Sequence, residues 1–137
     1  MPNPRVELPA ALAAALHEEA RQAAPRECCG LLEGRRAEGV YTILALHPVR
    51  NLSDDPDHFE IDPGGHIAAV KIARANGTTI LGCYHSHPRG SAQPSASDLA
   101  GAGEENFLWL IVADEAIRAF FYSGRVFVGA DCVTSSE

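Results

Sequence analysis

Two histidines and an aspartate lie close together in the stretch from His85 to Asp98. His85 and His87 are two positions apart at the expected end of a strand, so their side chains point to the same face. Pro88 ends the ladder of hydrogen bonds and places both histidines at a sheet edge near solvent. Imidazole nitrogens and a carboxylate oxygen suit zinc, and three protein ligands leave a fourth position open, as in catalytic sites. The stretch therefore predicts a catalytic zinc site held by His85, His87 and Asp98.

The residues before the aspartate predict the start of a helix. Ser95 is a favourable N-cap, and Asp98 falls in the first turn three residues later, where its carboxylate can turn back toward the preceding loop. A general base is also needed, and Glu27 is the candidate because it directly precedes an apolar run, Cys28–Leu32, that is expected to form a strand. Pairing of that strand with Thr78–His85 would bring Glu27 near the histidines.

The elements that must position these residues follow from the pattern of apolar and turn residues. Helices are expected at Pro9–Ala24, at Asp62–Ala75 and from Ser95 onward. The expected strands are Cys28–Leu32, Val40–Val49, a short one at His58–Ile61, Thr78–His85, Phe107–Ala113, Ala116–Tyr122 and Val126–Gly129. The polar stretches Arg50–Asp57 and Ser86–Pro94 are expected to be loops. Helices mixed with runs of adjacent strands indicate an α/β or α+β fold around one sheet, in a single domain over residues 1–137.

Composition restricts the class of protein. The chain has 137 residues, of which 46% are hydrophobic and 21% charged, as in an ordinary globular protein. The net charge is −7 and no basic stripe occurs, which argues against a nucleic-acid partner. No apolar run is long enough to cross a membrane, and the first residues lack the features of a signal peptide, so we expect a cytoplasmic protein. Four cysteines without a C-x-x-C pair are expected to be reduced thiols.

The motif resembles that of a known family. The pattern H-x-H-P-x6-S-x2-D with a glutamate far upstream is similar to the JAMM motif of MPN+ metalloproteases. The segment Pro25–Gly34, with the sequence PRECCGLLEG, resembles the part of bacterial members that carries the catalytic glutamate, and His58–Pro63 also resembles a stretch found in them. The similarity extends from Leu8 to Val128, and the short chain looks like the compact bacterial members of the family.

This resemblance implies a single-domain MPN/JAB-like fold with a curved mixed sheet flanked by helices. It implies one zinc ion per chain, held by His85, His87 and Asp98. Glu27 would then be the general base that moves a proton from water to the leaving amine, and the Ser95 hydroxyl would stabilise the oxyanion. The implied activity is hydrolysis of a peptide or isopeptide bond after the C-terminal Gly-Gly of a ubiquitin-like protein, and for a compact bacterial member the preferred substrate is a ubiquitin-like sulfur-carrier protein.

Other interpretations of the same residues stay open. The chain could be a non-catalytic MPN-type interaction module that retains zinc for stability, or a metallohydrolase acting on small molecules or cell-wall peptides. Cys83 shares the face of the histidines and is either a further ligand or a buried core thiol. Ser86 is either a turn residue or a hydrogen-bond donor near the site. A homodimer is compatible with the sequence. The remaining histidines have no ligand spacing: His17, His47, His58 and His66.

Overall fold

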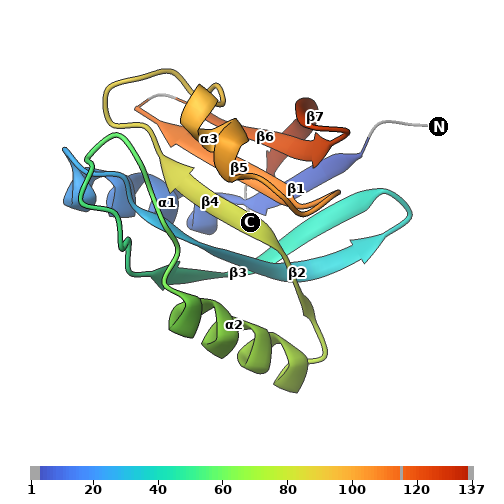
Figure 1. Cartoon of the computed structure of the whole chain (residues 1–137). Coiled ribbons are helices and arrows are strands. Elements are labelled where there is room, and N and C mark those ends of the chain that lie inside the picture. Colours follow the sequence, from blue (N-terminus) through green and yellow to red (C-terminus); the bar gives the residue numbers. More distant parts are fainter. Residues whose placement is uncertain (1–3, 115, 136–137) are drawn as a thin grey trace.

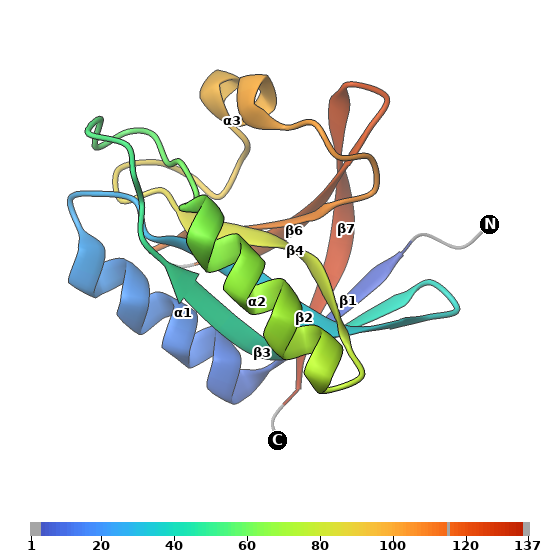
Figure 2. The same ribbon diagram turned by 60° about the horizontal axis from the view of Figure 1, so that its bottom comes forward.

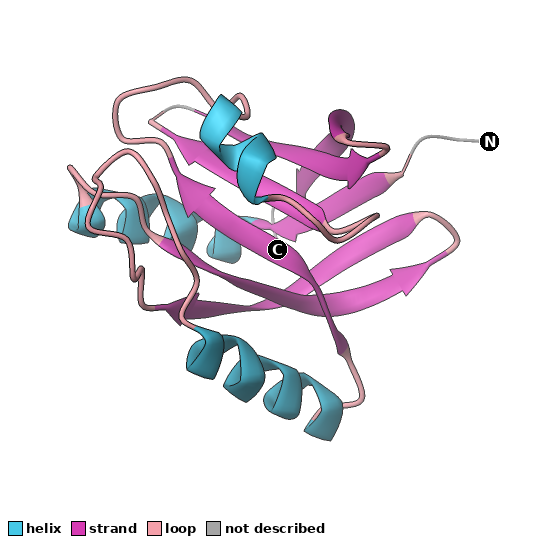
Figure 3. Ribbon diagram, in the orientation of Figure 1, coloured by secondary structure: helices cyan, strands magenta, loops and turns pink. Residues whose placement is uncertain are grey.

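The structure is a computed structural model that describes residues 4–114 and 116–135. The described residues form three helices interspersed among seven strands (Figures 1 and 3). Their order is β1 (Arg5–Pro9), α1 (Ala10–Ala23), β2 (Cys29–Ala37), β3 (Val40–Val49), α2 (Pro63–Ala75), β4 (Thr79–Ser86), α3 (Ala96–Gly101), β5 (Leu108–Ala113), β6 (Ala116–Ser123) and β7 (Val126–Ser135). No helix in this described part of the chain is long and apolar enough to span a bilayer.

The strands form one mixed sheet that closes on itself. Their spatial order is β1-β3-β2-β4-β5-β6-β7, and closure comes from β1, which pairs parallel with both β3 and β7. The pair β4–β5 is also parallel, whereas β2–β3, β2–β4, β5–β6 and β6–β7 are antiparallel. The expected α/β architecture with a curved mixed sheet is confirmed, and the closure by β1 is a feature that the sequence patterns did not predict.

The two long helices lie on opposite faces of the sheet, as Figure 2 shows for α2 crossing the outside of β2, β3 and β4. Successive residues of β5 contribute to two separate apolar clusters, because side chains alternate across a strand. Leu110 packs in the cluster of Leu16 from α1, whereas Ile111 packs in the cluster of Ala69 from α2. The sheet is therefore buried on both faces where it carries β4 and β5, the strands that lead into the candidate site.

Two expectations for the elements were wrong. His58–Ile61 is not a strand; only the isolated bridge Asn51↔Ile61 occurs there, because the Glu60 N–H donates to the Asn51 side chain instead of a neighbouring strand. Strand β1 was not expected at all, since its pairing partners lie far away in the sequence. Strand β2 also continues past the expected Leu32 to Ala37, close to the start of β3 at Val40.

Candidate metal centre

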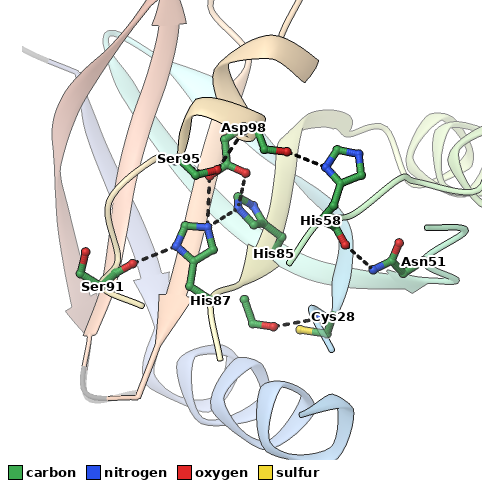
Figure 4. A network of polar contacts seen from close by, with 10 residues as sticks. Cys28, Asn51, His58, His85, His87, Ser91, Ser95 and Asp98 are labelled. Atoms are coloured by element: carbon green, nitrogen blue, oxygen red, sulfur yellow. Dashed lines mark hydrogen bonds and ion pairs between the residues drawn. The ribbon is translucent and has the colours of Figure 1, made fainter. Parts of the chain in front are cut away.

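Strand β4 delivers the two histidines to one point. His85 lies inside the sheet, opposite Cys29 of β2 and Ile111 of β5, and is fully buried, so the expected position at a sheet edge near solvent is wrong for this histidine. His87 follows the end of β4 and remains tied to β5 by its backbone N–H, which donates to the Val112 carbonyl at 2.8 Å. The Nε2 atoms of His85 and His87 are 3.0 Å apart. The spacing of two residues at a strand end therefore does bring both imidazoles together (Figure 4).

Helix α3 brings the carboxylate to the same point. The Ser95 hydroxyl caps the helix by accepting from the Asp98 N–H at 3.0 Å, and the Asp98 Oδ2 accepts from the Ser95 N–H at 2.8 Å. This reciprocal pair is a capping box, which fixes the carboxylate against the first turn. Asp98 Oδ1 lies 3.0 Å from His85 Nε2, and Oδ2 lies 3.1 Å from His87 Nε2.

Glu27 reaches the group from the segment between α1 and β2. Ligand atoms of four residues all lie within 4.8 Å of one another: Glu27, His85, His87 and Asp98. The approach depends on the antiparallel pairing of β2 with β4, which extends past the ladder to Cys28 and Ser86. The Ser86 N–H donates to the Cys28 carbonyl at 3.1 Å, and the Ser86 hydroxyl accepts from the Cys28 N–H at 2.8 Å. Ser86 thus joins the two segments that carry the histidines and the glutamate.

His85, His87 and Asp98 fit a zinc ion, because their nitrogen and oxygen atoms are suitable ligands and lie close together. Ligands of a tetrahedral zinc ion bound at 2.0–2.1 Å lie about 3.3 Å from one another, and the observed separations of 3.0–3.1 Å are close to that value. His87 Nδ1–H donates to the Ser91 carbonyl at 2.8 Å, which leaves the Nε2 lone pair free to bind a metal. Cys83, by contrast, is outside this group and packs in the apolar cluster of α2.

The acidic groups of the site have opposite pKa shifts. Burial of Asp98 opposes its ionisation, but the contacts with the His85 and His87 rings outweigh burial and hold the pKa of Asp98 well below its ordinary value. Burial raises the pKa of Glu27 to about 7, and the nearby Asp98 charge adds to this rise while His87 opposes it. Glu27 is only 6% exposed, and its Oε1 has no hydrogen-bond partner among the described residues. Asp98 is thus held as an anion, whereas Glu27 has a raised pKa and an Oε1 atom without a hydrogen-bond partner among the described residues.

The histidines also differ from each other. Burial lowers the pKa of His85 in spite of its contact with Asp98. Burial alone would also lower the pKa of His87, but the hydrogen bonds to Asp98 and to the Ser91 carbonyl outweigh burial, so the pKa of His87 is raised. A metal ligand must be a neutral imidazole, and full burial favours that form for His85.

A cavity of about 350 Å³ lies beside Asp98. One wall is the segment 58–61, and the other is formed by α3 and the following loop, including Gly101 and Gly103. Phe59 stacks on the His85 ring, with the ring centroids 4.3 Å apart and the planes inclined by 19°. His58, for which the sequence indicated no role, contacts Ser97 of α3 through Nδ1 and Oγ at 2.7 Å. The similarity of His58–Pro63 to bacterial members indicates this wall, which is a loop and not the expected strand.

Comparison with known proteins places the chain in a family. It matches the family described as prokaryotic homologs of the JAB domain, Prok-JAB, over residues 9–123. A desampylase of Haloferax volcanii is 32% identical over 105 residues, which cover 75% of this chain and 74% of that protein. A probable TtuB-protein conjugate cleaving protease of Thermus thermophilus is 34% identical over 98 residues, or 71% of this chain, and the chain spans 62% of that protein's length.

Solved structures agree with this assignment. The solution structure of a Desulfitobacterium hafniense protein has a TM-score of 0.89 and 32% identity, with coverage of 96% of this chain and 94% of that one. A JAB1/MPN domain protein from Archaeoglobus fulgidus has a TM-score of 0.58 at 20% identity, with coverage of 97% and 100%, and so shares the fold. Together with the JAMM-type motif, these matches show that the chain belongs to the family of prokaryotic homologs of the JAB domain.

Proposed function

We propose that this protein is a zinc-dependent metallopeptidase that hydrolyses a peptide or isopeptide bond after the Gly-Gly tail of a ubiquitin-like or sulfur-carrier protein. The observation that carries the proposal is the convergence of two imidazoles, one carboxylate and a buried, unpaired glutamate within 4.8 Å. The substrate class is supported by the relatives whose names describe cleavage of protein conjugates, the desampylase and the TtuB-conjugate protease.

His85, His87 and Asp98 would hold the metal. When bound, zinc supplies a Lewis acid that polarises a carbonyl and makes a water molecule more acidic. Glu27 takes the proton from the attacking water and passes it to the leaving amine, which must depart as a neutral group. Its burial keeps competing solvent away, and its unpaired Oε1 is free to accept that proton.

Ser95 has a second role in this proposal. Its hydroxyl oxygen accepts from the Asp98 N–H, so the hydroxyl proton can still be donated. Donation to the oxygen of the scissile carbonyl would stabilise the negative charge that develops in the transition state. The capping box keeps this hydroxyl beside Asp98, and therefore beside the metal ligands.

The cavity next to Asp98 supports an extended peptide as the substrate. It ends at a metal ligand, and its walls include the aromatic rings of Phe59 and Trp109 together with Gly101 and Gly103. A C-terminal tail lying there would present its last carbonyl to the metal ligands. The set of three ligands with an added general base favours an enzyme over a non-catalytic module, for which Glu27 would have no use.

The test combines metal analysis with cleavage. We expect the purified protein to bind about one zinc ion per chain and to cleave a fusion in which a ubiquitin-like or sulfur-carrier domain is joined through Gly-Gly to a reporter. Glu27→Ala should lower kcat about 100- to 10,000-fold and leave a measurable residual rate, whereas the exposed Glu18→Ala on α1 serves as the matched control and should cleave like the wild type. If Glu27→Ala and the wild type behave alike on every tail, the peptidase proposal is wrong.

A further inference from the structure

The side chain of Asn51 uses its full hydrogen-bonding capacity next to the candidate metal centre. Its Nδ2 donates to the Glu27 carbonyl at 3.0 Å and to the His58 carbonyl at 3.2 Å. Its Oδ1 accepts from the N–H groups of Ser53 and Glu60, both at 2.9 Å. An amide group has two donor hydrogens and two acceptor lone pairs, so all four are used here.

These bonds join two parts of the site that are far apart in the sequence. Three of them close the segment 51–61 into a compact loop, which is otherwise held by the isolated bridge between Asn51 and Ile61. Residues 58–61 of this loop form one wall of the cavity, and the Phe59 ring stacks on His85. The fourth bond leaves the loop and ends on the main chain of Glu27. Figure 4 shows the Asn51 amide directed at the His58 carbonyl.

Contacts to the main chain, and not to the Oε1 atom of the side chain, hold Glu27 in place among the described residues. The β2 ladder begins only at Cys29, and within the described residues no backbone N–H donates to the Glu27 carbonyl. Oε1 of its carboxyl group likewise has no partner there that could hold it in place. Two contacts fix the peptide unit that joins Glu27 to Cys28: the Asn51 amide donates to its carbonyl, and the Ser86 hydroxyl accepts from its N–H.

We propose that Asn51 is a positioning residue, which sets the place of the Glu27 carboxylate by holding the Glu27 carbonyl and couples it to the loop 51–61, whose residues 58–61 line the cavity. The inference rests on the proposed role of Glu27 as general base. Among the described residues, the four hydrogen bonds of Asn51 end on Glu27, Ser53, His58 and Glu60 and not on a metal ligand, so its effect on turnover passes through Glu27. A shift of about 1 Å in a catalytic group can lower a rate about 100-fold, which makes such an anchor important for turnover.

Asn51→Asp tests the proposal with almost no change in shape. The aspartate keeps an acceptor for the Ser53 and Glu60 N–H groups, but it places an oxygen against the two carbonyls that now receive hydrogen bonds. We expect kcat to fall about 10- to 100-fold with KM changed less than threefold, and zinc occupancy to equal that of the wild type. In the Glu27→Ala background the same substitution should cause no further loss, because the group through which it acts is absent.

A second measurement does not depend on cleavage. In ¹⁵N NMR spectra of the metal-free protein, Asn51→Asp should move the amide signals of Glu27 and Cys28 while those of β6 and β7 stay in place. Ser53→Ala is the matched control: it removes a side-chain contact within the same loop, to the Asp55 N–H, without touching Glu27. This control should leave the Glu27 and Cys28 signals and kcat unchanged.

The outcomes separate this inference from the proposed function. Unmoved Glu27 and Cys28 signals, or a rate loss of the same size in the Glu27→Ala background, would overturn the positioning role. Moved signals in a protein that cleaves no tail would support the positioning role and contradict the peptidase proposal. If Asn51→Asp does not unfold cooperatively, Asn51→Ser replaces it, since a neutral hydroxyl can donate to only one of the two carbonyls; the same results are expected.

Discussion

The polar cluster around Glu33 offers a quantitative test of the fold at a place away from the metal centre. Glu33 is 3% exposed on β2, and its carboxylate accepts from the Thr78 hydroxyl at 2.6 Å and the Asn76 amide at 3.2 Å, and contacts His47 Nε2 at 2.7 Å. These contacts link β2 to β3 and to the turn between α2 and β4. The hydrogen bond from Thr78, with smaller effects of His47 and Asn76, outweighs burial and lowers the pKa of Glu33.

Glu33→Gln keeps the shape of the side chain and removes its charge. Hydrogen bonds to a charged group contribute about 1.5–3 kcal/mol, against about 0.5–1.5 kcal/mol for neutral ones, so three bonds together lose about 3 kcal/mol. Part of this free energy is regained because a neutral amide costs less to bury than the Glu33 carboxylate. We therefore expect a net loss of about 2 kcal/mol in the free energy of unfolding. For a chain of this size, that loss lowers Tm by about 6–8 °C.

The difference in the free energy of unfolding between the wild type and Glu33→Gln should become smaller in acid. The pKa of Glu33 is lower in the folded than in the unfolded state, so its ionised form stabilises the fold above the unfolded value of about 4.3. This stabilisation is lost as pH falls from there through the folded pKa. The deficit of Glu33→Gln should therefore be complete at pH 7 and should shrink below about pH 4.3.

Urea unfolding followed by circular dichroism, between pH 7 and pH 3.5 and with a chelator present, measures this difference. The chelator prevents metal binding from adding to the stability of the folded state. Glu38→Gln, at an exposed position in the turn after β2, is the control and should change stability by less than about 0.5 kcal/mol. A Glu33→Gln variant as stable as the wild type at pH 7, or a deficit that does not shrink in acid, would refute the reasoning.

Two further predictions concern the site and the sheet. Asp98→Ala should lower zinc occupancy measured by atomic absorption, whereas Glu27→Ala should leave it unchanged; equal loss in both would contradict the assigned roles. Gly82→Ala should destabilise the fold by about 3 kcal/mol, because its Cβ would lie 1.9 Å from the Leu108 carbonyl oxygen, a backbone atom that cannot yield without disturbing the β4–β5 pair. Gly129→Ala on β7, where a Cβ meets no atom within 4 Å, is its control in urea unfolding, and similar losses in the two variants would disprove the steric argument.

The sequence by itself determined the elements that depend on neighbouring residues. Asp62 accepts from the Gly64 N–H and starts α2, and the Ser95 hydroxyl accepts from the Asp98 N–H and starts α3. Both caps act within a few residues, so the pattern of residue types is sufficient to predict them. The spacing of His85 and His87 is equally local, because a strand fixes which side chains share a face.

The tertiary structure decided which distant segments meet. The approach of Glu27 to the histidines requires the register in which Cys29 pairs with His85, and a shift of one residue would point the side chains to opposite faces. No local pattern specifies that register. The closure of the sheet by β1 depends in the same way on pairing with residues 40–42 and 131–135.

The segment 51–61 shows most directly why sequence patterns could not predict the contacts around Glu27. Its residues resemble a loop followed by a short strand, but the Glu60 N–H donates to the Asn51 side chain and the His58 N–H to the Asp55 carbonyl instead of to a neighbouring strand. An asparagine can bond to many partners, and its residue type does not indicate which ones the fold will supply. The sequence therefore identified the groups able to bind a metal, whereas only the folded chain brought Asn51 to the carbonyl of Glu27.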